Sequence, residues 1–129
     1  MSALVLLVDD NEVNRYLAQY LLERAGCTVL LAANGVEALA AARAQRPDLV
    51  LMDIRMPLMD GYEATSRLKA DPDLAAIPVV ALSANAMPQE KARALEVGCL
   101  AHIEKPIDVT RFIEQLAELL PGRFGVGTS

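Results

Sequence analysis

The sequence predicts a doubly wound α/β fold, in which one parallel β-sheet lies between two layers of helices. Two observations support this prediction. Five short apolar runs recur along the 129 residues, with helical stretches between them and after the last. The first four runs are continuously apolar, as strands covered on both faces should be. Because crossovers between parallel strands are right-handed and helices must cover both faces, the expected architecture is a three-layer sandwich.

The N-terminal elements are an expected strand at residues 3–8, a helix at 12–25 and a second strand at 28–33. The helix carries four residues on one face that would pack against the sheet: Val13, Leu17, Leu21 and Ala25. Gly26 follows the helix as a natural C-terminal stop. This segment therefore has the order of a strand–helix–strand unit.

The middle of the chain continues the alternation. Asn34 and Glu37 resemble a capping box, which would open a helix of about ten residues that ends before Pro47. A third strand is expected at residues 49–53 and a third helix at 61–70.

The C-terminal part supplies the last two strands, at residues 79–83 and 101–104. Between them a helix is expected at 88–97, with Pro88 in its first turn and Gly98 at its end.

The final helix has the clearest apolar period in the chain, with Asp108 as its N-cap. Its apolar face comprises Val109, Phe112, Ile113, Leu116 and Leu120. Residues 121–129 are Gly-rich and aperiodic. We therefore expect one domain at residues 1–120 and a flexible tail at 121–129.

Composition excludes several classes of protein. The net charge is −5 and the pI is about 4.8, which argue against a nucleic-acid-binding surface. No apolar stretch approaches the roughly 20 residues of a membrane span, and the acidic N-terminal segment is unlike a signal peptide. With one histidine and the distant Cys27 and Cys99, a zinc site is not expected, and both thiols fit a cytoplasmic protein.

Polar residues stand where the expected strands end. Asp9 and Asp10 follow the first strand, Asp53 ends the third, Ser83 ends the fourth, and Lys105 follows the fifth. The carboxyl ends of parallel strands share one edge, where such sheets bind ligands. Three aspartates gathered there form a hard-oxygen site suited to Mg²⁺, which would offset their mutual repulsion.

Each of these residues alone has a simpler interpretation. The Asp9-Asp10 pair could be a solvated strand end with Asp10 capping a helix, Ser83 could be a loop cap, and Lys105 could be an exposed surface residue. Asp53 is harder to explain in this way, because it follows a fully apolar run. The combination at the ends of the right strands favours a functional site.

The same residues carry a resemblance to a known family. Residues 3–120 resemble the receiver domain of two-component response regulators. Their motif sequences are similar to those of receivers in hybrid sensor kinases and of single-domain cell-cycle regulators. The matching stretches are LLVDDNEVNRYLAQYLLERAG, DLVLMDIRMPLMDGYEATSRLK, IPVVALSA and AHIEKPI. The resemblance implies a flavodoxin-like fold with strand order 2-1-3-4-5.

The resemblance also implies a phosphoacceptor and a metal site. Asp53 would accept a phosphoryl group from a phosphohistidine on a histidine kinase or a phosphotransfer protein. Asp10 would bind Mg²⁺ directly and Asp9 through water, with the main-chain carbonyl of Arg55 and the Asp53 carboxylate as further ligands. The chain would not be an enzyme beyond catalysing its own phosphorylation and dephosphorylation.

Other positions receive implied roles around the phosphoryl group. Ser83 and Lys105 would each contact a phosphoryl oxygen, and Ala84 would leave room for it. Arg55 and Asn85 would occupy the two positions that tune the lifetime of the phosphate.

One position departs from the family pattern. Where the family usually has Tyr or Phe as an aromatic switch, this chain has His102, which could equally be an exposed residue of an edge strand. Pro106 follows Lys105 and could form a cis peptide bond. The resemblance further implies a downstream protein partner on the face of helix 88–97, strand 101–104 and the final helix.

Three other classes of protein share some of these features. A phosphatase of the haloacid dehalogenase type needs Asp-x-Asp on its first strand, whereas here two aspartates are adjacent. A flavin- or nucleotide-binding module would need a Gly/Ser/Thr-rich phosphate loop, whereas DDNEVN would repel phosphate. A receiver-like interaction module that never carries phosphate usually lacks the acid pair or the acceptor, and both are present here.

Overall fold

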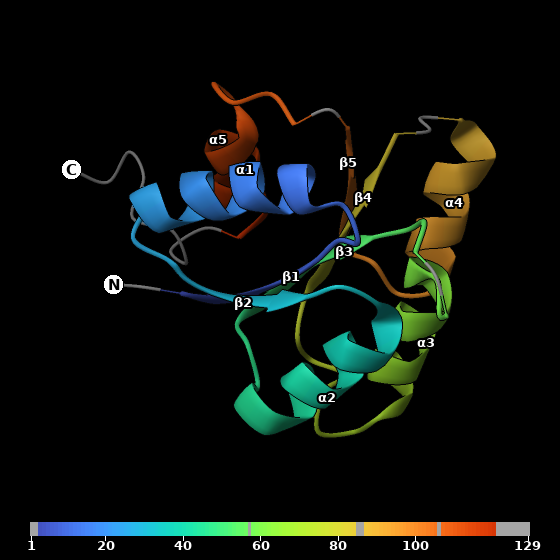
Figure 1. Cartoon of the computed structure of the whole chain (residues 1–129). Helices are drawn as coiled ribbons and strands as arrows, with labels where there is room; N and C mark the ends of the chain where they lie inside the picture. Colours follow the sequence, from blue (N-terminus) through green and yellow to red (C-terminus); the bar gives the residue numbers. More distant parts are fainter. Residues whose placement is uncertain (1–2, 57, 85–86, 106, 121–129) are drawn as a thin grey trace.

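The computed structural model of the chain describes residues 3–56, 58–84, 87–105 and 107–120. Five parallel strands form one sheet in the order β2-β1-β3-β4-β5. The strands are β1 (Leu4–Val8), β2 (Thr28–Ala32), β3 (Leu49–Asp53), β4 (Val79–Ser83) and β5 (Ala101–Glu104). The predicted fold and strand order are therefore confirmed, and β3 is the central strand (Figure 1).

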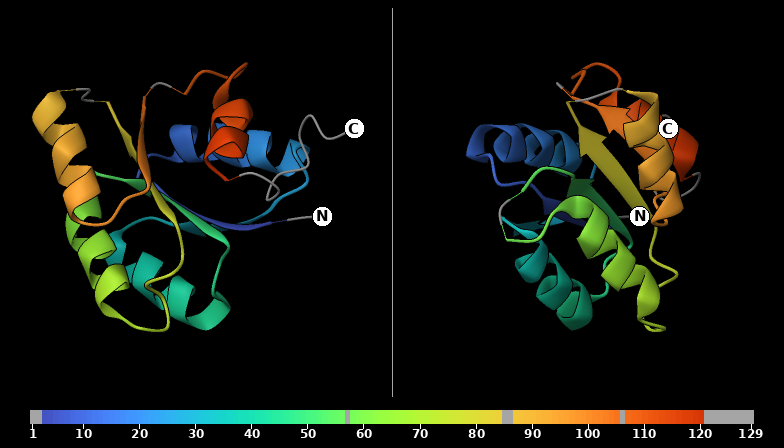
Figure 2. Two further views of the ribbon diagram at one scale, coloured as in Figure 1. Left: turned by 180° about the vertical axis from the view of Figure 1, so that it is seen from behind. Right: turned by 90° about the vertical axis from the view of Figure 1, so that its right-hand side faces the viewer.

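Helices cover both faces of the sheet, as Figures 1 and 2 show. They are α1 (Glu12–Arg24), α2 (Gly35–Gln45), α3 (Gly61–Ala70), α4 (Pro88–Glu96) and α5 (Phe112–Leu119). α1 and α5 lie on one side of the sheet, and α2, α3 and α4 lie on the other. The three-layer sandwich follows from this arrangement.

The core consists of two apolar clusters, one on each face of the sheet. In β1, Leu6 and Val8 belong to the cluster under α2, α3 and α4, whereas Val5 and Leu7 belong to the cluster under α1 and α5. Successive side chains of a strand point to opposite faces, so a strand covered on both sides must be apolar at every position. This explains the continuous apolar runs of the central strands.

The edge strand β2 departs from the expectation of a strand covered on both faces. Its exposure varies along its length, and the Leu31 side chain is 45% exposed. β2 pairs only with β1 in the sheet, so the helices that cover the centre do not fully cover it.

The predicted core face of α1 is wrong at its first residue. Val13 is 77% exposed, and the buried residues of the helix are Ala18 and Leu22. Each buried residue of α1 follows a residue of the predicted apolar face by one position, so the buried face is rotated about the helix axis relative to the prediction. Leu17 and Leu21 of that stripe are half-buried and line a groove with Ile113 of α5.

The last helix begins later than its apolar period predicts. α5 starts at Phe112, and Asp108 caps a preceding turn instead of the helix. The Asp108 carboxylate accepts hydrogen bonds from the backbone N–H and the hydroxyl of Thr110, at 3.0 and 2.7 Å. Ser, Thr, Asn and Asp side chains commonly divert the backbone in this way. Val109 lies in this turn and is 54% exposed.

The other signals for helix ends agree with the structure. The Asn34 side chain accepts a hydrogen bond from the backbone N–H of Glu37, and α2 ends before Pro47 as expected. In a standard capping box the Glu37 carboxylate would accept a hydrogen bond from the N–H of the N-cap residue Asn34. Here it accepts from the N–H of Ala33, the residue before the N-cap. The expectations for Asn85, Pro106 and the tail at 121–129 lie outside the described residues.

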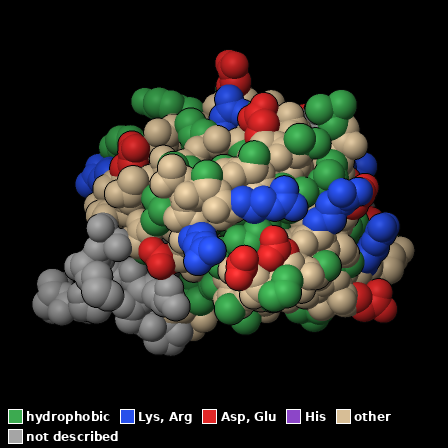
Figure 3. Space-filling view, turned by 90° about the horizontal axis from the view of Figure 1, so that it is seen from below, with side chains coloured by type: hydrophobic (Ala, Val, Ile, Leu, Met, Phe, Trp, Pro, Cys, Tyr) green, Lys and Arg blue, Asp and Glu red, His purple; other side chains and the backbone are tan. Residues whose placement is uncertain are grey.

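The described helices and one face of the surface bear on the expectations about membranes and nucleic acid. Within these residues, no helix has the length and apolar character needed to cross a bilayer. In Figure 3, which looks at the molecule from the side of α2 and α3, basic and acidic side chains lie interspersed. A continuous basic patch of the kind that binds a phosphate backbone is not visible on this face.

Candidate functional site

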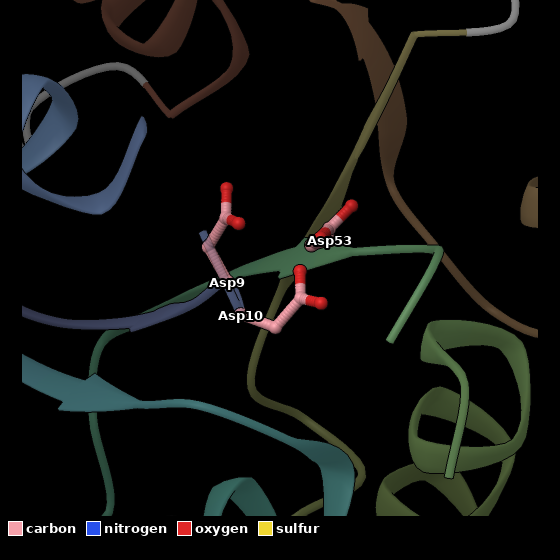
Figure 4. Close-up of side chains that lie close together, drawn as sticks. All are labelled: Asp9, Asp10 and Asp53. Carbon is pink, nitrogen blue, oxygen red and sulfur yellow. The ribbon is translucent and has the colours of Figure 1, made fainter. Parts of the chain in front are cut away.

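The polar residues at the strand ends gather at one edge of the sheet, as predicted. Asp9 and Asp10 follow β1, Asp53 ends β3, Ser83 ends β4 and Lys105 follows β5. They line an open cleft of about 230 Å³. Figure 4 shows the three aspartates at the ends of β1 and β3. The cleft is also lined by Asn11, Asn14, Arg55 and Ala84.

Asp9 is almost fully buried and is held by several hydrogen bonds. Its backbone N–H donates to the carbonyl of Ala32 at 3.0 Å. Its Oδ1 accepts from the N–H of Asn11 at 2.9 Å, and its Oδ2 lies 2.9 Å from Nζ of Lys105. Both carboxylate oxygens therefore have partners within the chain, and the side chain is fixed.

Asp53 is the buried carboxylate on the central strand. It is 5% exposed, and its Oδ1 accepts a weak hydrogen bond from the N–H of Arg55 at 3.3 Å. The pKa of Asp53 is raised to about 6, mainly by burial: Lys105 opposes this rise, the nearby Asp9 adds to it, and the hydrogen bond from the Arg55 N–H opposes it. Burial disfavours the charged form, so positive charge in the cleft would relieve this cost.

Lys105 bridges the two buried carboxylates. Its ammonium lies 2.9 Å from Oδ2 of Asp9 and 3.2 Å from Oδ1 of Asp53. Burial lowers the pKa of Lys105, but the hydrogen bond to Asp9 and the charges of Asp53 and Asp9 outweigh burial and raise it. One ammonium thus faces two carboxylates, and the cleft keeps an excess of negative charge.

The three aspartates have the chemistry of a Mg²⁺ site. One carboxylate oxygen from each of Asp9, Asp10 and Asp53 lies within 4.8 Å of the others. Asp10 is exposed, whereas the other two are buried. Mg²⁺ prefers oxygen ligands from one or two carboxylates and keeps several waters, so this donor set in an open cleft fits it.

Ser83 and the β3–α3 connection complete the walls of the cleft. Ser83 is 2% exposed and pairs with Glu104 of β5 at the end of the sheet. After β3 the chain turns back closely, and a Cβ atom at Gly61 would collide with the carbonyl oxygen of Asp53. Glycine is therefore required there, and Asp60 before it caps α3 by accepting from the N–H of Glu63 at 2.9 Å.

His102 is neither an exposed edge residue nor a ligand of the cleft. It pairs with Ala81 in the sheet and is half-buried, and its Nε2 is buried with no hydrogen-bond partner among the described residues. Burial lowers the pKa of His102; Lys91 lowers it further, and Glu104 and Glu90 act in the opposite direction. The neutral ring is therefore favoured in this environment.

Sequence reasoning missed three residues around the acid pair. Asn11 caps α1 by accepting from the N–H of Asn14 at 3.0 Å, and both residues line the cleft. The guanidinium of Arg15 donates to the carbonyl oxygen of Asp9 at 2.9 Å. An Asn after Asp-Asp could have signalled the helix cap. The Arg15 contact is a hydrogen bond from a long side chain to a backbone carbonyl, and such a contact produces no periodic pattern in the sequence.

Comparison with known proteins agrees with this geometry. Residues 5–117 match the family model described as the response regulator receiver domain. The chain is 46% identical to the polar-differentiation response regulator DivK of Brucella anthropi over 120 residues, which cover 93% of this chain and 98% of that protein. A DivK of Brucella ovis is 44% identical with the same coverage.

Solved structures give the same result. The chemotaxis response regulator CheY4 of Vibrio cholerae superposes with a TM-score of 0.88 at 31% identity, covering 93% of this chain and all (100%) of that one. The receiver domain of a sensor histidine kinase from Pseudomonas aeruginosa, with a magnesium ion coordinated in its active-site cleft, gives a TM-score of 0.84 at 34% identity. That match covers 92% of this chain and 98% of the other. The chain therefore belongs to the response regulator receiver domain family and is a module of two-component signal transduction.

Proposed function

We propose that this receiver domain accepts a phosphoryl group on Asp53 in the presence of Mg²⁺ and thereby switches a protein-docking surface. The observation that carries the proposal is the position of Asp53. Its carboxylate ends the central strand, lies 3.2 Å from the ammonium of Lys105, and shares the cleft with the carboxylates of Asp9 and Asp10. A nucleophile, a fixed cation and a cation-binding acid pair are the parts that phosphoryl transfer needs.

In the proposed reaction, a carboxylate oxygen of Asp53 attacks the phosphorus of a phosphohistidine. A P–O bond forms, the P–N bond breaks, and the histidine nitrogen leaves with the bonding electron pair. The Asp53 carboxyl must be ionised to attack, and Lys105 favours its ionised form. Hydrolysis returns the domain to its unphosphorylated form, because water attacks the phosphorus and Asp53 leaves as a carboxylate.

Charge neutralisation is the main contribution of the remaining groups. Lys105 would contact an oxygen of the transferred group, and the Ser83 hydroxyl would donate to another. Asp10, Asp53 and the main-chain carbonyl of Arg55 would hold Mg²⁺ directly, and Asp9 would hold it through water. The bound ion would neutralise charge that develops on the phosphoryl oxygens. Ala84 also lines the cleft, and its small side chain would leave space for the group.

The partners and location follow from the same proposal. The donor would be a histidine kinase or a histidine phosphotransfer protein, and the receiver would act in the cytoplasm as one domain at residues 1–120. The downstream partner would dock on the face formed by α4, β5 and α5. Leu95 of α4 is 56% exposed and Leu100, just before β5, is 45% exposed, and exposed apolar side chains in these elements favour a protein-binding surface. Ser83 and His102 would couple this face to the phosphorylated site, and Arg55 would tune the phosphate lifetime.

Acetyl phosphate with Mg²⁺ tests the proposal without the natural donor. Intact-mass spectrometry should show one acid-labile phosphoryl adduct on the wild type and none on Asp53→Asn. Asp73→Asn is the matched control, because Asp73 is exposed and does not line the cleft. It should carry the adduct as the wild type does.

The alternative outcomes are distinct. An unchanged adduct in Asp53→Asn would show that another residue is the acceptor. A wild type that gains no adduct with any donor, yet binds a protein partner, would indicate a phosphorylation-independent interaction module. Continuous release of phosphate from simple phosphate esters would favour the phosphatase alternative.

A further inference from the structure

Arg15 of α1 contacts the backbone of the acid pair. Its Nη1 donates a hydrogen bond to the carbonyl oxygen of Asp9 at 2.9 Å, and this contact is partly buried. The backbone N–H of Arg15 also donates to the carbonyl of Asn11 at 3.0 Å, within the first turn of the helix. The side chain thus reaches from α1 back to the loop that carries both aspartates.

The bond fixes one particular peptide unit. The carbonyl of Asp9 belongs to the peptide that joins Asp9 to Asp10, so its direction sets the plane from which the Asp10 side chain departs. The N–H of Asp9 is held by Ala32 at 3.0 Å, and its carboxylate is held by Asn11 and Lys105. The Arg15 contact supplies a partner for the remaining polar group of Asp9.

Asp10 depends on this arrangement more than Asp9 does. Its side chain is exposed, whereas that of Asp9 has a partner on each carboxylate oxygen. The direction of the Asp10 carboxylate is therefore set mainly by the backbone on either side of it. On the N-terminal side this is the peptide held by Arg15, and on the C-terminal side it is the capping residue Asn11.

Arg15 also brings positive charge to a second side of the acid pair. Lys105 approaches Asp9 from the end of β5, and Arg15 approaches from α1. A charge-assisted hydrogen bond to the carbonyl draws electron density away from the peptide next to two carboxylates. The guanidinium therefore favours a loop conformation that would otherwise be opposed by carboxylate repulsion.

We propose that Arg15 is a positioning residue for Mg²⁺ coordination: it holds the Asp9–Asp10 peptide so that the Asp10 carboxylate faces Asp53. This inference rests on the proposed function, because it assumes that the acid pair binds Mg²⁺. Residues that orient metal ligands without touching the metal typically change metal affinity 10- to 100-fold when replaced.

Isothermal titration of Mg²⁺ at pH 7.5 tests the inference. Arg15→Met keeps most of the aliphatic stem and removes the donor and its charge, and we expect Mg²⁺ to bind about 10-fold more weakly to it. Arg15→Lys keeps a cationic donor and should recover most of this loss. The matched control is Arg24→Met, which removes an equal charge from the same helix. The Arg24 guanidinium donates to Tyr20 and does not line the cleft, so Mg²⁺ affinity should be unchanged.

A second readout separates positioning from a general loss of structure. Phosphorylation of Arg15→Met by acetyl phosphate should be slow at low Mg²⁺ and should approach the wild-type rate at saturating Mg²⁺. In metal-free protein, the amide NMR signals of Asp10 and Asn11 should shift more in Arg15→Met than in Arg15→Lys. If Arg15→Met does not fold, Arg15→Lys and Arg15→Gln give the same comparison, with Gln as the variant expected to lose affinity.

The possible failures can be told apart. If the wild type binds Mg²⁺ but Arg15→Met and Arg24→Met bind it equally well, the inference is overturned and the proposed function stands. If slow phosphorylation of Arg15→Met persists at saturating Mg²⁺, with unchanged Mg²⁺ affinity, Arg15 does not act through the metal and the inference is also overturned. If the wild type binds no Mg²⁺, the proposed function itself fails.

Discussion

The ammonium of Lys105 lies 3.2 Å from Oδ1 of Asp53, so an ion pair joins the ends of β5 and β3 across β4. The same ammonium lies 2.9 Å from Oδ2 of Asp9. Both carboxylates are buried, and one cation cannot balance both. Burial then raises the pKa of Asp53 to about 6 despite this neighbour. The metal-free cleft is therefore electrostatically costly, and removal of one negative charge should stabilise the fold.

Asp53→Asn should stabilise the metal-free protein at pH 8. The folded-state pKa of Asp53, about 6, lies above its ordinary value of 3.8, so the folded state holds this proton more tightly than the unfolded chain. Stability is therefore full below pH 4 and is lost as the pH rises through 6. A shift of about two units corresponds to about 3 kcal/mol, which is the largest gain expected for the variant at pH 8.

Urea unfolding in a chelating buffer measures this effect at pH 4.5 and pH 8. The difference between Asp53→Asn and the wild type should be large at pH 8 and small at pH 4.5. An Asp53→Asn protein that is less stable than the wild type at pH 8 would show that the Lys105 ion pair outweighs the cost of burial.

Asp10→Asn should weaken Mg²⁺ binding without weakening the metal-free fold. Asp10 is exposed and adds negative charge beside Asp9 and Asp53, so its neutralisation relieves repulsion. Mg²⁺ that binds only the native state raises the melting temperature, and this rise should be smaller in the variant. Thermal melts with and without Mg²⁺ measure both effects. If Asp10→Asn is less stable than the wild type without Mg²⁺, the acid pair stabilises the fold instead of serving metal binding.

Much of this site could be predicted from the sequence, because parallel strands bring their carboxyl ends to one edge. Asp53 and Lys105 are 52 positions apart in the chain, yet Asp53 ends β3 and Lys105 follows β5, and strand order places them together. The same reasoning works for Ser83. It depends on topology, which hydrophobic runs and helix caps specify well.

Other features depend on packing that a one-dimensional pattern does not contain. The buried face of α1 is set by how the helix lies on the sheet, so Val13 fits an apolar stripe and is still exposed. Val109 fits the period of α5, but the Asp108 side chain holds it in a turn. Arg15 was missed because its contact with Asp9 depends on where a long side chain reaches.

Tyr62→Phe should loosen α4 from α3 and destabilise the protein by about 1–2 kcal/mol. The Tyr62 hydroxyl of α3 donates to the Glu90 carboxylate of α4, and the Arg93 guanidinium lies 4.3 Å from the ring centroid. Burial and this hydrogen bond raise the pKa of Tyr62 to about 12, so the donor persists over the working pH range. Tyr62→Phe removes the hydroxyl and keeps the ring contact.

Tyr20→Phe is the matched control for this prediction. Tyr20 is 47% exposed, and its hydroxyl accepts from Arg24 at 3.0 Å on the surface of α1. Its loss should change the free energy of unfolding by less than about 0.5 kcal/mol. Equal effects of the two substitutions in urea unfolding would show that the Tyr62–Glu90 contact does not hold α4 against α3.

His102 should make the response of the α4–β5–α5 face to activation depend on pH. Its Nε2 is buried without a partner among the described residues, and burial lowers the pKa of the ring below 6.5. Lys91 of α4 also disfavours the protonated ring, whereas Glu90 of α4 and Glu104 of β5 favour it. Any inward movement should therefore favour the neutral ring, which is the main form at pH 8 and is lost as the pH falls through the lowered pKa.

NMR shift changes on activation by beryllofluoride test this in the wild type and in His102→Tyr, at pH 6 and pH 8. A phenol buries more apolar surface than an imidazole and does not titrate in this range. We therefore expect larger changes on the α4–β5–α5 face in His102→Tyr, and a response that depends on pH only in the wild type. Equal responses at both pH values in both proteins would leave His102 without a role in the switch, even though its ring is half-buried.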